Sequence, residues 1–300
     1  MAGEPGQGVI AMATDQLSPL LNLSMFDRGK GADHFAVSRI VLHRLLTTGL
    51  EDVIHYGHRF DRVEQLKSGQ VRVHFTNGAS TEGDILVAAD GVNSAIRKQL
   101  LPESFGPGKS GIAGIAGKVF LDTKEILDDI PQLKRGICII PGTEGRGIFL
   151  APQTYSADAK FQITKLFSGD DGVTHEAQLA PNAAGEDLLL IGGKEKKKLV
   201  DDARDYVFYG YLTKYPETDF PNLKEISQLE MLNNVVAHME KANWSPNLLK
   251  MVKMTDVNTV GYWPLHVSPH ITDLSSYKPS NVTFLGDSIH ASTASFLFTS

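Results

Sequence analysis

The feature of the sequence that most constrains its fold is a pattern that occurs twice, far apart along the chain. A short apolar run ends at a Gly/Asp pair, and small residues follow at once. The first copy is GDILVAADGVNSAIRKQLLP, residues 83–102, and the second is NVTFLGDSIHAST, residues 281–293. A continuous apolar run of this length is typical of a buried strand in an α/β protein. We therefore expect two strands that leave a sheet at their carboxyl ends, followed by the carboxylates of Asp90 and Asp287.

Each of these turns has the chemistry of a ligand site. Gly91 and Gly286 allow the backbone to approach a ligand closely, and a carboxylate beside them suits the hydroxyl groups of a sugar or ribityl chain. A helix follows Asp90, with Asn93 or Ser94 as its N-cap, and its first turn is expected to offer free N–H groups to an anion. The alternative for each turn alone is an ordinary Asp-Gly turn at the end of a strand, because short motifs are weak signals.

The remaining sequence divides into a mixed part and a β-rich part. Residues 38–49 have helical spacing, strands are expected at 52–60, 70–78 and 83–90, and Asn77-Gly78 is a tight turn between the last two of them. A short helix is possible at 17–23. From 104 to 278, β-like segments separated by polar turns predict a largely antiparallel sheet, with helices near 223–239 and 247–254.

Composition excludes several classes of function. There are 29 basic and 35 acidic residues and a net charge of −6, which provides no electrostatic footprint for nucleic acid. The apolar runs are too short for a membrane span. Cys138 is the only cysteine, so no disulfide framework and no metal site is expected, and a soluble protein of the reducing cytoplasm is predicted.

The two acidic turns together resemble those of a known family. They are similar to the second and third fingerprints of FAD-dependent monooxygenases of the para-hydroxybenzoate hydroxylase type, the single-component aromatic hydroxylases with many fungal members in secondary metabolism. The segment SRIVLHRLL, residues 38–46, resembles the family helix whose arginine reaches the FAD pyrophosphate, which is Arg39 here. The resemblance covers roughly residues 26–292 and implies FAD contacts by Arg39, Asp90, Gly91, Gly286 and Asp287.

The resemblance also implies a fold and a reaction. The fold is an α/β, glutathione-reductase-like FAD-binding domain, formed by residues 1–105 and 275–300, with a mainly antiparallel substrate domain, residues 106–274, inserted in it. The reaction implied is oxygenation of a small organic substrate by a flavin hydroperoxide, with NAD(P)H and O2 as co-substrates. The catalytic residues cannot be read from the sequence.

The sequence departs from the family at both ends. The G-x-G-x-x-G turn of the first βαβ unit has no counterpart, since Gly6-Gln7-Gly8 lacks a preceding strand, and the Pro/Gly-rich loop after Asp287 is absent. We therefore expect a truncated chain of low stability that binds FAD weakly. Two alternatives remain: a non-catalytic remnant of such an enzyme, and a flavin-linked oxidoreductase without oxygenation.

Overall fold

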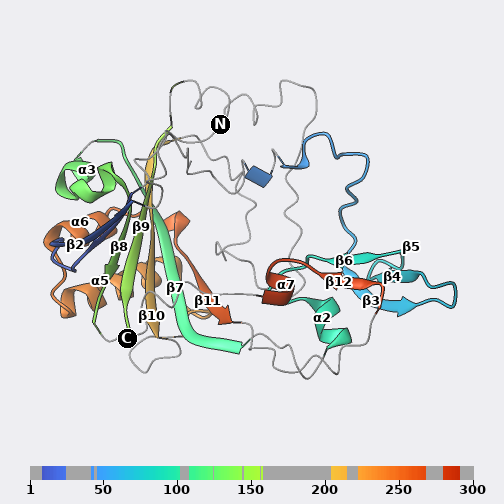
Figure 1. Cartoon of the computed structure of the whole chain (residues 1–300). Coiled ribbons are helices and arrows are strands. Elements are labelled where there is room, and N and C mark those ends of the chain that lie inside the picture. Colours follow the sequence, from blue (N-terminus) through green and yellow to red (C-terminus); the bar gives the residue numbers. More distant parts are fainter. Residues whose placement is uncertain are drawn as a thin grey trace.

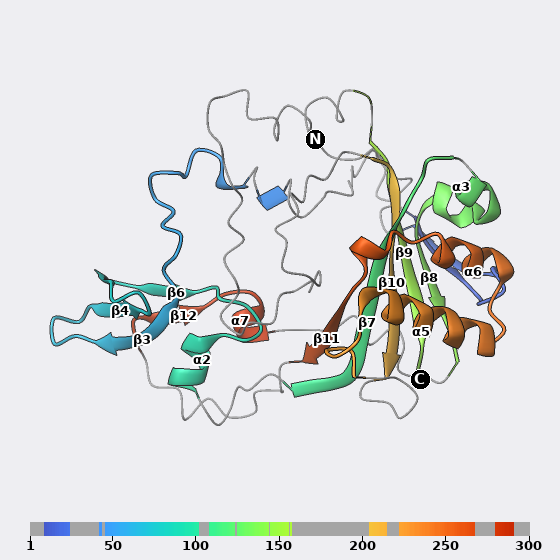
Figure 2. The same ribbon diagram turned by 180° about the vertical axis from the view of Figure 1, so that it is seen from behind.

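The computed structural model describes residues 9–24, 42–43, 46–101, 108–123, 125–143, 145–155, 157, 204–214, 222–267 and 280–290. These residues form two parts, a large sheet with helices on one face and a smaller mixed part (Figure 1). The smaller part lies on the side of the large sheet away from those helices, and the view from behind shows the same arrangement (Figure 2).

The large sheet has seven strands in the order β11-β7-β10-β9-β8-β1-β2. All neighbouring strands are antiparallel except β1 and β8, which are parallel. This confirms the largely antiparallel sheet expected for the β-rich part of the chain. Its strands are β1 (Val9–Ala13), β2 (Pro19–Ser24), β7 (Gly108–Phe120), β8 (Gly136–Pro141), β9 (Gly147–Gln153), β10 (Tyr206–Lys214) and β11 (Gly261–Val267).

Successive side chains along these strands point alternately to the two faces of the large sheet. Helices cover one face, and the face away from these helices is called the open face. Tyr209 and Tyr211 of β10 are fully buried in a core that includes Val235 and Met251 of the covering helices. The neighbours Phe208 and Gly210 therefore point to the opposite, open face. The helical elements of this part are α3 (Glu125–Asp129), η1 (Pro131–Lys134), α5 (Gln228–Lys241), α6 (Pro246–Lys253) and η2 (Val257–Thr259).

The main covering helix, α5, has a well-defined start. The Ser227 side chain accepts a hydrogen bond from the Glu230 backbone N–H, and the Glu230 carboxylate accepts one from the Ser227 backbone N–H, which is a capping box. The Ser227 hydroxyl also donates to the Glu230 carboxylate at 2.6 Å, and this bond, followed by the one from the Ser227 backbone N–H, lowers the pKa of Glu230. The helix then buries Leu232, Val235 and Met239 at helical spacing against the sheet.

The smaller part consists of a three-stranded antiparallel meander, β3-β4-β5, and a parallel pair, β12-β6. Its core is formed by valines of the meander, by Ile96 and by the inward side chains of the parallel pair, such as Ala88 and Val282. Its elements are β3 (Phe60–Gln65), β4 (Val71–Phe75), β5 (Ser80–Gly83), β6 (Leu86–Ala88), α2 (Ala95–Leu100), β12 (Val282–Phe284) and α7 (Asp287–His290).

Several local predictions for the amino-terminal half are wrong. Residues 17–23 belong to strand β2 instead of a helix, and residues 52–57 are turns with the strand beginning only at Phe60. The Asn77-Gly78 turn does follow β4, but it leads into the unpredicted strand β5. β1 and β2 also lie in the large sheet, although residues 1–105 were assigned to the cofactor domain, because β1 pairs with β8. The division at 105/106 and 274/275 otherwise stays a prediction.

Within the described residues, no helix combines the length and the apolar character needed to cross a lipid bilayer.

Candidate functional site

The two acidic turns lie side by side because the strands that lead to them are paired. β6 and β12 run parallel, with Leu86 opposite Val282 and Ala88 opposite Phe284. One residue further on, the Leu285 N–H donates to the Ala88 carbonyl at 2.9 Å. Parallel strands in register end at the same edge of a sheet, so Asp90 and Asp287 follow two neighbouring strand ends. The two strands that we expected to leave a sheet at their carboxyl ends are present, and they are neighbours.

Ser288, in the first turn of α7, fastens the two strand ends together. Its side chain is fully buried, and its hydroxyl lies 2.7 Å from the Ala88 carbonyl oxygen and 2.8 Å from that of Leu285. The same hydroxyl accepts from the Leu285 N–H at 3.1 Å. A buried hydroxyl is stable only when it is hydrogen-bonded, and here its partners belong to both strands.

Arg97, in α2, is the second connection between the turns. Its side chain is buried, with 3% of its surface exposed, and its guanidinium donates to the Ser288 carbonyl at 2.5 Å and to the Asp287 carbonyl at 3.3 Å. A further short hydrogen bond reaches the Val92 carbonyl. Burial lowers the pKa of Arg97, and the nearby Asp90 carboxylate raises it. The planar guanidinium of Arg97 thus binds carbonyl groups of both turns at the same time.

The carboxylate of Asp90 is directed into its own turn. Its Oδ2 accepts hydrogen bonds from the backbone N–H groups of Ala95 at 2.9 Å and Ile96 at 3.3 Å. Ser94 is the N-cap of α2, as predicted, and accepts from the Arg97 N–H at 2.9 Å. The prediction that the start of this helix offers free N–H groups to an anion is therefore wrong, since side chains of the same turn occupy three of them.

Asp287 differs from Asp90 in both exposure and bonding. Its side chain is exposed, and in the described part of the chain its carboxylate has no hydrogen-bond or ion-pair partner. Gly286 before it has φ +64°, and a Cβ at this position would meet nothing within 4 Å. Gly91 likewise has φ +80° with open space around it. A free acceptor beside an open glycine fits a ligand that carries hydroxyl groups.

The parallel pair is covered on one face only. Leu86, Ala88 and Val282 belong to the core of the smaller part, whereas alternate residues point away from it. Among those that point away, Ile85 is 69% exposed and Leu285 is 63% exposed. Exposed apolar side chains at a strand pair are unfavourable in water, and they agree with the low stability that we expect from the missing βαβ unit.

The remaining residues considered in the sequence analysis, and those that it missed, are placed as follows. Arg39 lies outside the described residues. His290 is exposed. No group of three or more His, Cys, Asp or Glu side chains that could hold a metal ion occurs among the described residues. Arg97 and Ser288 were missed as site residues. The sequence signal that could have identified them is their position, since Ser288 directly follows Asp287 and Arg97 lies in the helix that begins after Asp90.

Solved structures with a similar architecture include proteins that contain FAD. A protein described as an FAD-containing monooxygenase from Photorhabdus luminescens subsp. laumondii matches 98% of this chain with a TM-score of 0.68 and 21% identity, and the match covers 64% of that protein. HpxO of Klebsiella pneumoniae, solved with FAD and uric acid, matches 97% with a TM-score of 0.64 and 20% identity, and 58% of that chain is covered. The predicted fold class is confirmed.

Curated relatives are similar in sequence over most of the chain. The dual O-methyltransferase/FAD-dependent monooxygenase elcB of the fungus Phaeosphaeria nodorum is 27% identical over 275 residues, which is 86% of this chain and 26% of that protein. This chain therefore spans about a quarter of that relative's length. No family model matches the chain. The predicted resemblance to FAD-dependent monooxygenases, and thus to a class of enzymes, is confirmed.

Proposed function

We propose that the paired turns after β6 and β12 bind FAD, and that the chain takes part in the monooxygenation of a small organic molecule. The observation that carries the proposal is the junction itself: two acidic turns are held together by Arg97 and Ser288, and no group among the described residues pairs with the Asp287 carboxylate. The proteins named above support it, because two of them are described as FAD monooxygenases and the third was solved with FAD and uric acid.

The residues of the junction have different roles in this proposal. Asp287 accepts hydrogen bonds from the ribityl hydroxyls, and Gly286 allows the ligand to approach the backbone. Asp90 shapes the neighbouring turn by capping α2, and Gly91 gives that turn its positive φ. Arg97 is a positioning residue that holds the carbonyl groups of both turns. Arg39 remains assigned to the pyrophosphate by resemblance alone.

When bound, FAD supplies an oxygenation chemistry that takes its electrons from NAD(P)H and its oxygen atom from O2. The open face of the large sheet is the surface on which we place the substrate, since the acidic turns lie on that side of it (Figures 1 and 2). The use of NAD(P)H and a cytoplasmic location are parts of this proposal.

Titration of FAD with the protein, followed by flavin fluorescence, tests the binding site. A hydrogen bond to a charged acceptor contributes about 1.5–3 kcal/mol, so Asp287→Asn is expected to weaken FAD binding by roughly ten- to a hundredfold. Asp52→Asn is the matched control, because Asp52 is also exposed and does not belong to the two turns of the junction. Thermal melts of both variants should agree with the unmodified protein.

Equal FAD affinity for Asp287→Asn and Asp52→Asn would remove Asp287 from the site. A chain that takes up no flavin after refolding with FAD would support the non-catalytic remnant. Substrate-stimulated NADPH oxidation with an oxygenated product distinguishes a monooxygenase from a flavin-linked oxidoreductase. Purification with a full complement of flavin would contradict the expectation of weak binding.

A further inference from the structure

The open face of the large sheet carries a tryptophan that lies flat across two strands. Trp263 is on β11, and its indole ring covers Gly114 of β7 and Gly210 of β10. A Cβ at Gly114 would overlap three atoms of the indole, and one at Gly210 would lie 3.3 Å from it. The ring therefore occupies space that two glycines leave free, and its position depends on both of them.

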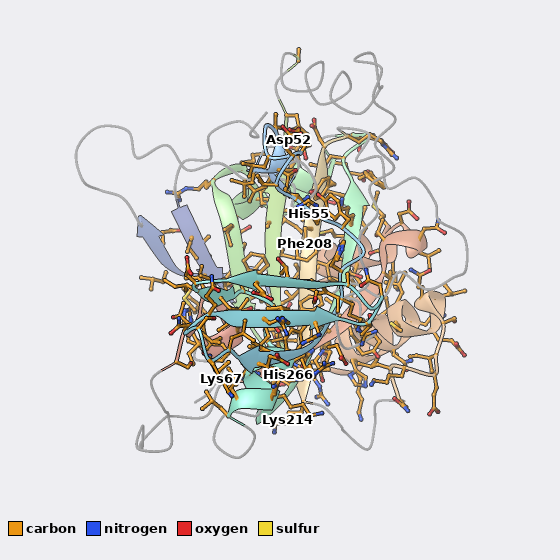
Figure 3. The ribbon with its side chains drawn as sticks, turned by 90° about the vertical axis from the view of Figure 1, so that its right-hand side faces the viewer. Asp52, His55, Lys67, Phe208, Lys214 and His266 are labelled. Atoms are coloured by element: carbon orange, nitrogen blue, oxygen red, sulfur yellow. The ribbon has the colours of Figure 1, made fainter. Side chains whose placement is uncertain are left out.

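Phe208 extends this surface along β10. A Cβ at Gly210 would lie 4.0 Å from the Phe208 ring as well as close to Trp263, so both aromatic rings border the same glycine. Phe208 and Trp263 are only partly buried, while Tyr209 between Phe208 and Gly210 points into the core on the other face. In Figure 3 the meander stands in front of the sheet and Phe208 lies behind it on β10.

Small apolar residues occupy most of the strand positions paired around the two rings, and Lys118 of β7 is the other partner of Phe208. Ala116 pairs with Gly210 and with Gly261, and Ala151 pairs with Phe208. Neighbouring strands are about 4.8 Å apart, so a surface over β7 and β10 extended by Phe208 is roughly 10 Å wide. That width is suited to two or three fused rings, and a flat floor favours a flat molecule because a puckered ring contacts it with fewer atoms.

We propose that Trp263 and Phe208 form a stacking platform that selects planar fused-ring substrates over non-planar ones of the same size. This inference deepens the proposed function, since it names the substrate class for the face on which we place the substrate. Trp263 is a specificity-determining residue in this proposal, and Gly114 fixes the height of its ring above the sheet.

The test compares 2-naphthol with decahydro-2-naphthol, which has the same carbon skeleton and hydroxyl group but is not planar. Calorimetric titrations are performed on the protein with and without FAD, and on three variants. Trp263→Leu removes the platform, and Gly114→Ala keeps the tryptophan but displaces its ring. Tyr56→Leu removes an aromatic side chain that is 53% exposed elsewhere and is the control for non-specific binding.

We expect the unmodified protein and Tyr56→Leu to prefer 2-naphthol by roughly three- to tenfold, the range of a good aromatic contact. The preference should disappear in Trp263→Leu and decrease in Gly114→Ala, while circular dichroism shows that each variant is folded. Equal affinity for both compounds, or an unchanged preference in both variants, would overturn the platform. FAD binding without the preference refutes only this inference, and the preference without FAD binding refutes only the proposed function.

Discussion

Replacement of Arg97 by methionine is the sharpest test of how the two turns are held together. The change keeps most of the side-chain volume but removes the guanidinium that donates to the carbonyl groups of Val92, Asp287 and Ser288. These carbonyls lie in segments that are about 190 residues apart in the sequence, so no local interaction replaces the lost connection.

The expected loss of stability follows from the three hydrogen bonds. A hydrogen bond from a charged donor contributes about 1.5–3 kcal/mol, and two of the three are short, which gives roughly 3–6 kcal/mol. The desolvation of a buried guanidinium, which also lowers the pKa of Arg97, offsets part of this. We therefore expect Arg97→Met to lower the free energy of unfolding by about 2–4 kcal/mol.

Urea unfolding followed by far-ultraviolet circular dichroism measures this loss, and hydrogen exchange at the amides of β6 and β12 locates it. Lys98→Met is the control, because the neighbouring lysine is exposed and the charge change is the same. Its effect should stay within about 0.5 kcal/mol. If Arg97→Met unfolds at the same urea concentration as Lys98→Met, the guanidinium does not join the turns and the reasoning is refuted.

Three further predictions concern the start of α5 and the second glycine turn. Ser227→Ala should lower the free energy of unfolding by about 1 kcal/mol, the usual contribution of an N-cap. Because the folded-state pKa of Glu230 lies below its ordinary value of 4.5, its contribution is present above that value and is lost as the pH falls through the lowered pKa. The difference between Glu230→Gln and the unmodified protein should therefore shrink on acidification in thermal melts, and a constant difference would contradict this. Gly286→Ala should cost about 1–2 kcal/mol in urea unfolding, because φ is +64° and the new methyl group meets nothing that compensates; an unchanged midpoint would show that the turn tolerates a side chain.

The sequence predicted most strongly the elements whose signals are local. Two continuous apolar runs predicted β6 and β12, Asn93 and Ser94 were the two candidates for the N-cap that Ser94 forms, and helical stretches were expected close to α5 and α6. The sequence-based prediction was wrong where residue types that favour strands occur outside a strand. Residues 52–57 contain Val, Ile and Tyr, which are typical of strands, yet they form turns, and no local signal shows that β1 pairs in parallel with β8.

What the sequence by itself determined is where the chain turns and which residues lie there. An apolar run followed by glycine and aspartate restricts the backbone locally, and Gly91 and Gly286 have the positive φ that such turns use. Only the tertiary structure decided what those residues do. It turned the Asp90 carboxylate onto its own helix, left that of Asp287 without a partner among the residues described above, and buried Arg97 between the two turns. Burial and hydrogen bonding of these groups depend on atoms almost two hundred residues away, and no local pattern in the sequence records such a contact.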